Sequence, residues 1–304
     1  MSFNEGAQLD PSQVEDRRGS GMGRGGKTGI GIVGALILLV GGYFGINSGV
    51  LNGLVDAVDG GQAQQQPAGP VASGGANECK TGADANNRLD CRITATANSL
   101  NAFWPGYLKQ RGAKYTQIKT VLFDGQVSTG CGPASTDVGP FYCPADKIAY
   151  FDPGFFQELV DRFGSSGGPL AQEYVVAHEF GHHVQDNLGS ISNAQDDPQG
   201  ASSGSVRVEL QADCYAGIWM KYASTTKDPA TGQPFLKPLS QKDLNDALSA
   251  ASSVGDDRIQ KAATGRTNPE SWTHGSSAQR QKWLTIGYQN GDVAKCDTFS
   301  VRTP

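Results

Sequence analysis

The sequence has few histidines and no concentration of positive charge. Only four histidines occur among 304 residues, and the formal net charge is −5. No basic stripe is visible, so nucleic acid is not expected to be the main partner. The glycine-rich run at residues 21–26 does not join a predicted strand to a helix, which argues against a phosphate-binding loop. The length suits one large domain or two modest ones.

Charge is entirely absent from residues 28–47, TGIGIVGALILLVGGYFGIN. This stretch is about as long as a helix that crosses a bilayer. Basic residues precede it, and none follows until Lys80. The positive-inside rule therefore predicts a cytoplasmic polar tail at 1–27, a transmembrane helix at 28–47 and an extracytoplasmic body. A cleaved signal peptide is the alternative.

Residues 48–77 lack the apolar residues that a core requires. They are rich in glycine, glutamine, alanine and proline, which is typical of a flexible linker. The folded domain is therefore expected at 78–304. We expect a mixed α+β fold, mainly helical with a small sheet.

The paired C-x-x-C spacing of a zinc ribbon is also absent. All six cysteines follow the predicted span, which favours up to three disulfides in an oxidising compartment. Six cysteines allow 15 pairings. Proximity along the chain suggests Cys79–Cys91 and Cys131–Cys143, which leaves Cys214–Cys296. Free buried thiols are the alternative.

Three of the four histidines lie in VVAHEFGHHVQ, residues 175–185. His178, Glu179 and His182 form an H-E-x-x-H motif. Gly167, Gly168 and Pro169 before it, and Gly189 after it, predict a single helix around the motif. Residues four apart share one helix face, so two imidazoles can bind one zinc ion. Glu179 lies beside that face and can reach a metal-activated water as general base.

A second predicted helix, residues 205–222, supplies the remaining ligand. Glu209 and Asp213 are four residues apart and share a face. One carboxylate can bind the metal, and the other can accept the free N–H of a ligand histidine. An ordinary solvated acidic pair is the alternative. The small residue Gly181 would let a second backbone approach the first helix.

H-E-F-G-H-H followed by E-L-Q-A-D-C resembles the gluzincin pattern of metallopeptidases. More closely, the chain is similar to a bacterial family of neutral zinc metallopeptidases with one N-terminal membrane span. Further matches are CGPASTDVGPFYCPADKIAYFD, GDDRIQ, THGSSAQR and CDTF. The resemblance implies that His178, His182 and Glu209 bind zinc and that Glu179 is the general base. It also implies that Asp213 does not bind the metal itself but accepts a hydrogen bond from a ligand residue.

Other segments predict the surroundings of this site. Residues 91–112 read as an amphipathic helix, and residues 117–125 and 146–153 as strands. A sheet edge near the metal helix could hold an extended peptide, so Ala149–Phe151 is a candidate substrate edge. An inner strand is the alternative. The Cys131–Cys143 loop would border the cleft.

The remaining candidates are less tightly constrained. His183 points away from the metal face and is expected to be structural. His274 or Arg280 could stabilise the oxyanion of a tetrahedral intermediate. The alternative for His274 is a place at a helix start capped by Ser276 or Ser277. Asp256 and Asp257 are adjacent, so a second metal ion there is not favoured.

These observations predict a membrane-anchored zinc metallopeptidase, an endopeptidase that binds one Zn²⁺. Its partners would be peptide or protein substrates and the membrane. A zinc-binding scaffold that has lost turnover, a hydrolase or lyase of another class, and a fold that zinc merely stabilises are the alternatives.

Overall fold

Helices surround a small sheet in this protein, which we describe from a computed structural model. The structure describes residues 2–19 and 75–304, so the predicted span and nearly all of the predicted linker lie outside the described residues. Within those two ranges, none of the helices has both the length and the apolar character that a bilayer crossing requires. The α-helices are α3 (Gly82–Asn87), α4 (Leu89–Lys109), α5 (Phe155–Asp161), α6 (Pro169–Leu188), α7 (Gly204–Tyr222), α8 (Gln241–Ser253), α9 (Asp256–Thr264) and α10 (Ser277–Asn290).

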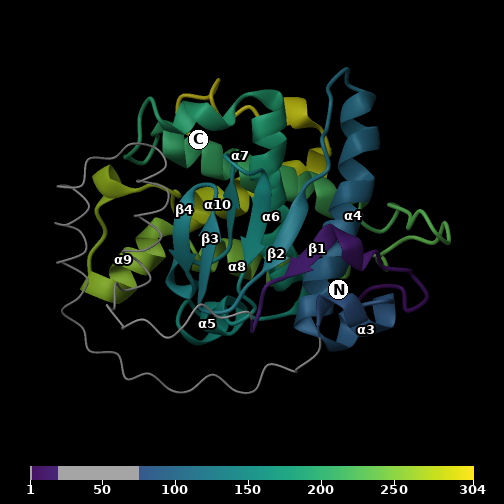
Figure 1. Ribbon diagram of the computed structural model, residues 1–304. Helices are drawn as coiled ribbons and strands as arrows, with labels where there is room; N and C mark the ends of the chain where they lie inside the picture. Colours follow the sequence, from purple (N-terminus) through teal and green to yellow (C-terminus); the bar gives the residue numbers. More distant parts are fainter. Residues whose placement is uncertain (1, 20–74) are drawn as a thin grey trace.

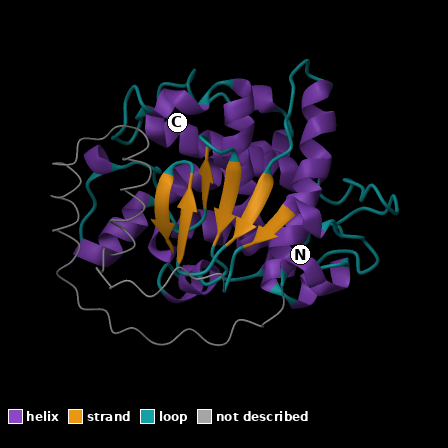
Figure 2. Cartoon of the chain, viewed as in Figure 1, coloured by secondary structure: helices purple, strands orange, loops and turns teal. Residues whose placement is uncertain are grey.

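The main sheet has four strands in the order β1, β2, β6, β5. Figure 2 shows the strands in orange, with helices in purple around them. Its strands are β1 (Val14–Asp16), β2 (Lys119–Leu122), β5 (Phe141–Cys143) and β6 (Ile148–Phe151). The first three in this order run parallel, and β5 is antiparallel to β6. A separate hairpin pairs β3 (Gln126–Thr129) with β4 (Gly132–Ser135). The mixed α+β class is as predicted, and the two predicted strands correspond to β2 and β6.

The strand predicted as the substrate edge lies inside the sheet. Thr120 of β2 pairs with Ala149 of β6, and Tyr142 of β5 pairs with the same Ala149 from the other side. The prediction that Ala149–Phe151 forms a substrate edge is therefore wrong, because both sides of β6 are hydrogen-bonded to neighbouring strands. Among the described strands, the edge next to α6 is β5.

Helices α6, α7 and α10 pack together on one side of the sheet (Figure 1). α6 begins at Pro169 and ends before Gly189, which has a left-handed φ of 78°. A Cβ atom on Gly181 would lie 2.8 Å from the carbonyl oxygen of Ala212, and one on Gly287 would lie 1.9 Å from that of Cys214. Glycine therefore lets α6 approach α7 closely, as predicted, and lets α10 do the same from the other side of α7.

The N-terminal segment differs from the expectation. Residues 1–27 were expected to form a polar tail outside the folded body, yet Phe3, Ala7, Leu9 and Val14 are buried in the core. β1 adds to the sheet beside β2. The polar composition of the segment concealed this because its few apolar residues are spaced irregularly and find their partners far along the chain.

Disulfides join Cys79 to Cys91, Cys131 to Cys143 and Cys214 to Cys296. These are the pairs that proximity suggested. The third bond links α7 to the segment after α10 and closes a sequence separation of 82 residues. It therefore ties the middle of α7, directly after Asp213, to the C-terminal segment.

Candidate metal centre

His178 and His182 project from one face of α6, one turn apart. Asp213 Oδ1 lies 2.9 Å from Nδ1 of His178, and Gln185 Oε1 lies 2.8 Å from Nδ1 of His182. Gln185 donates its own amide N–H groups to Val208 and Gln211, which leaves its oxygen facing His182. Both Nδ1 atoms are therefore engaged by an acceptor oxygen, so each ring would offer its Nε2 atom to a cation.

Glu209 approaches these two nitrogens from α7. Its carboxylate oxygens lie 3.2 Å from Nε2 of His178 and 3.3 Å from Nε2 of His182. The three side chains each offer a ligand atom, and these atoms all lie within 4.8 Å of one another. The structure thus brings together the three residues that the sequence proposed as ligands. Two imidazoles and a carboxylate, with room for a fourth ligand, are a donor set that zinc takes in catalytic sites.

Asp213 of α7 is held by residues on two other helices, α6 and α10. Besides His178, it accepts hydrogen bonds from Tyr174 of α6 and from Arg280 of α10. Arg280 Nε and Nη2 each lie 2.9 Å from a different oxygen of Asp213, and both side chains are buried. Such a bidentate pair fixes the carboxylate in plane as well as in position.

The sequence did not identify Tyr174 and Gln185, and it gave Arg280 a different role. Tyr174 lies four residues before His178 and Gln185 three residues after His182, so helical spacing could have indicated both. Arg280 was considered as an oxyanion donor. Two of its N–H groups are instead taken by Asp213, and Nη2 also donates to the Tyr174 hydroxyl. Its separation of 67 residues from Asp213 leaves no local signal for that pairing.

The charges in the site favour a cation between the two helices. Burial alone would lower the pKa of His178, but Asp213 and then Glu209 raise it to about 10. Burial would raise the pKa of Glu209, but His182 and His178 hold it well below the ordinary value. The buried carboxylates of Glu209 and Asp213 thus stabilise positive charge on His178, and they would stabilise a cation between the two helices in the same way.

Glu179 borders the same space but does not belong to the ligand group. Its side chain is buried, and burial raises the pKa of its carboxyl. Within residues 2–19 and 75–304, no hydrogen bond or ion pair holds this carboxylate. A carboxylate with a raised pKa and no fixed partner is suited to taking up and releasing a proton.

His274 lines the same cavity from the segment before α10. Its Nδ1 lies 2.8 Å from the Thr273 hydroxyl and 3.4 Å from Asp256 Oδ1. Asp256 Oδ2 also accepts the backbone N–H groups of Thr273, His274 and Gly275. Burial would lower the pKa of His274, but Asp256 and Glu209 raise it overall. Asp256 therefore fixes the position of His274.

Three further predictions concern His183, the helix cap at Ser276 or Ser277, and the pair Asp256 and Asp257. His183 lies between the Tyr142 hydroxyl, 3.0 Å from Nδ1, and the Thr116 carbonyl, 2.6 Å from Nε2, as expected of a structural residue. Ser276 caps α10. Asp257 accepts hydrogen bonds from Ser277, and neither it nor Asp256 belongs to a metal-binding group among the described residues.

A cavity of about 160 Å³ opens over the ligand residues. It is bounded by β5, by the Cys131–Cys143 loop and by α6, α7 and α9, so that loop borders the cleft as predicted. Much of its lining is apolar and includes Val138, Phe141, Phe155, Val175, Ile191 and Ile259. The cavity therefore combines the charged ligand residues with a largely apolar lining.

The fold and the site define a mixed α+β protein with a candidate metal centre of the H-E-x-x-H class. Comparison with protein families agrees: residues 4–299 match the model of a family described as "Putative neutral zinc metallopeptidase". The chain belongs to this family.

Relatives of the chain occur in Mycobacterium and in Escherichia coli. An uncharacterized protein of Mycobacterium tuberculosis is 63% identical over 224 residues, which is 74% of this chain and 75% of the relative. The uncharacterized protein YpfJ of Escherichia coli is 37% identical over 303 residues, which is 95% of this chain and 96% of the relative. No solved structure matched significantly.

Proposed function

We propose that the protein is a zinc-dependent peptidase that hydrolyses peptide bonds within its substrates, with a zincin-like site. The observation that carries the proposal is the convergence of His178, His182 and Glu209, whose ligand atoms lie within 4.8 Å of one another. These three residues would hold one zinc ion. When bound, zinc lowers the pKa of water and polarises the scissile carbonyl group.

Glu179 would act as the general base. It takes a proton from the attacking water and gives it to the nitrogen of the leaving amine. Its raised pKa supports this role because the buried carboxylate takes up a proton more readily than a solvated glutamate does. Asp213 and Gln185 keep the histidine tautomers fixed, so that both Nε2 atoms remain ligands throughout the reaction.

His274 would stabilise the oxyanion of the tetrahedral intermediate. Its raised pKa favours the protonated ring, which can donate a hydrogen bond to developing negative charge. Asp256 would act as a positioning residue, since it holds both the ring and the backbone on either side of it.

The substrate would be a peptide in extended form, lying along β5. Phe141 and Tyr142 of this edge strand line the cavity, and an extended chain can add to such an edge through backbone hydrogen bonds. The apolar lining favours substrates with a large apolar side chain beside the bond that is cut.

A peptide-library digest with the purified full-length protein tests this function. We expect cuts beside apolar residues that a chelator abolishes and added zinc restores. Glu179→Gln should retain zinc and lower the rate by roughly 10²–10⁴-fold. Glu270→Gln, at an exposed position, is the matched control and should cut normally. Zinc-loaded wild-type protein that cuts no peptide would instead be a binding scaffold, and the proposal would fail.

A further inference from the structure

The N-terminal segment, residues 2–19, is joined to the body by backbone hydrogen bonds along its length. Asn4 N–H donates to Phe235, Leu9 N–H donates to Lys80, and Gly82 N–H donates to Ala7. β1 then continues the main sheet, and Arg17 N–H donates to Leu122. Contacts of this kind fix the register of the segment as well as its place.

Two asparagines of the body each bind the segment in both directions. Asn86 accepts the N–H of Phe3 and donates to its carbonyl oxygen, at 2.8 and 3.0 Å. Asn98 does the same with Asp10, at 2.7 and 3.0 Å, and its side chain is buried. In this buried setting the Asn98 amide depends on the backbone of Asp10 for both hydrogen bonds, as a buried polar group requires.

Gly82, the first residue of α3, lies directly against the segment. A Cβ atom there would lie 2.0 Å from the carbonyl oxygen of Asn4 and 3.2 Å from Cβ of Phe3. Only a residue without a side chain fits at this distance. The body therefore leaves room for residues 2–19 at Gly82, which indicates a specific contact between the segment and the body.

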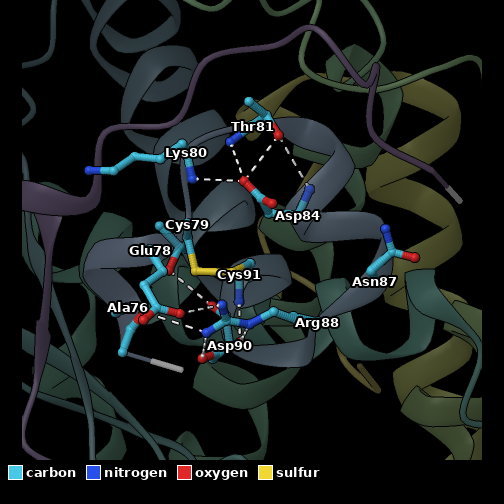
Figure 3. The surroundings of a disulfide bond; sticks show 12 residues. Ala76, Glu78, Cys79, Lys80, Thr81, Asp84, Asn87, Arg88, Asp90 and Cys91 are labelled. Atoms are coloured by element: carbon cyan, nitrogen blue, oxygen red, sulfur yellow. Dashed lines mark hydrogen bonds and ion pairs between the residues drawn. A yellow bond between two sulfur atoms is a disulfide. The ribbon is translucent and has the colours of Figure 1, made fainter. Parts of the chain in front are cut away.

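The residues just before position 20 and those just after position 74 contact the same region of the folded body. Asp16 accepts the N–H of Ala76 at 2.8 Å, and Arg18 Nη2 lies 2.9 Å from Asp90. Asp90 also pairs with Arg88 and lies next to Cys91, whose disulfide partner is Cys79 (Figure 3). Both flanks of residues 20–74 are thus attached to one small region around a disulfide.

We propose that residues 2–19 and 75–304 form one folded unit that lies on a single side of the membrane, the oxidising one. The disulfides identify that side, because such bonds persist outside the reducing cytoplasm. A chain whose residues 1–27 are cytoplasmic cannot make these contacts with an extracytoplasmic body. This inference replaces the single-pass arrangement predicted from charge, and it does not depend on the proposed function.

Cysteine labelling in intact spheroplasts tests the placement. Glu5→Cys reports on the segment and Thr267→Cys on the body; both positions are exposed. Among the described residues no free cysteine competes for the reagent. A membrane-impermeant maleimide should label both variants to the same extent as after permeabilisation. Glu5→Cys labelled only after permeabilisation, with Thr267→Cys labelled before it, would overturn the proposal. Protection of both would refute the extracytoplasmic placement.

A pair of glycine variants tests the docking itself in the purified full-length protein. Gly82→Ala should lower the melting temperature by roughly 3–10 °C and expose an N-terminal tag to protease, because the new methyl group displaces Asn4. Gly106→Ala in α4 is the matched control, since a Cβ there meets nothing within 4 Å. Equal melting temperatures and equal tag protection for the two variants would show that the segment does not dock.

Discussion

Glu173 on α6 should make the stability of the protein fall as the pH rises. Its side chain is fully buried, and neither carboxylate oxygen has a hydrogen-bond partner among the described residues. Burial raises the pKa of its carboxyl from the ordinary 4.5 to about 7, and nearby Arg92 offsets only part of the effect. Glu173 lies five residues before His178, and among the described residues no hydrogen bond joins its carboxylate to the candidate ligands.

The direction of this pH dependence is set by whether the folded or the unfolded chain holds the Glu173 proton more tightly. Below pH 4.5 both the folded and the unfolded chain are protonated at Glu173, so its ionisation does not affect stability. Between pH 4.5 and 7 the unfolded chain loses the proton while the folded chain keeps it, so stability falls with rising pH. Above pH 7 the loss is complete and amounts to about 3 kcal/mol, from 1.36 kcal/mol per pKa unit.

Glu173→Gln removes the titrating group at nearly constant volume. Urea denaturation should show the variant to be more stable than wild type by about 3 kcal/mol at pH 8 and by about 1 kcal/mol or less at pH 5. Glu270→Gln, on the surface, should leave stability unchanged at both pH values. A Glu173→Gln variant that is no more stable than wild type at pH 8 would refute the reasoning.

Three further predictions concern the site and its supports. Asp213→Asn should weaken zinc binding 10- to 100-fold in chelator competition, because His178 loses its carboxylate partner; unchanged affinity would contradict the role assigned to Asp213. Gly181→Ala places a methyl group 2.8 Å from the Ala212 carbonyl oxygen and should separate α6 from α7. Zinc affinity should therefore fall at least about tenfold. Wild-type affinity in this variant would show that zinc binding does not need the close contact between the two helices. Replacing Cys214 and Cys296 with alanine should destabilise the protein by about 1.7 kcal/mol more than replacing Cys131 and Cys143, from sequence separations of 82 and 12; equal losses in urea denaturation would refute the loop-entropy argument.

The helices of the site could be predicted because their signals are local. Pro169 and Gly189 bound α6, and a spacing of four places both histidines on one face. The same spacing pairs Glu209 with Asp213 on α7. Gly181 indicated a close approach, although not the identity of the helix that makes it.

Features that depend on distant parts of the chain could not be predicted. Strand order is one of these: the sequence of β6 does not show that β5 lies beyond it. The docking of residues 2–19 is another, since Asn86 and Asn98, which bind the segment, lie more than 80 residues away. Arg280 reaches Asp213 only because Gly287 lets α10 pack closely on α7.

The ligand set can be measured directly by metal analysis of the purified protein combined with X-ray absorption at the zinc edge. The proposed site predicts one zinc per chain, with two imidazole nitrogens and carboxylate oxygen at about 2.0–2.2 Å and no sulfur ligand. The zinc should be lost in His182→Ala and in Glu209→Ala, and retained in His183→Gln. A protein without zinc, a sulfur-ligated zinc, or full zinc occupancy in Glu209→Ala would contradict a centre built from two histidines of α6 and one glutamate of α7.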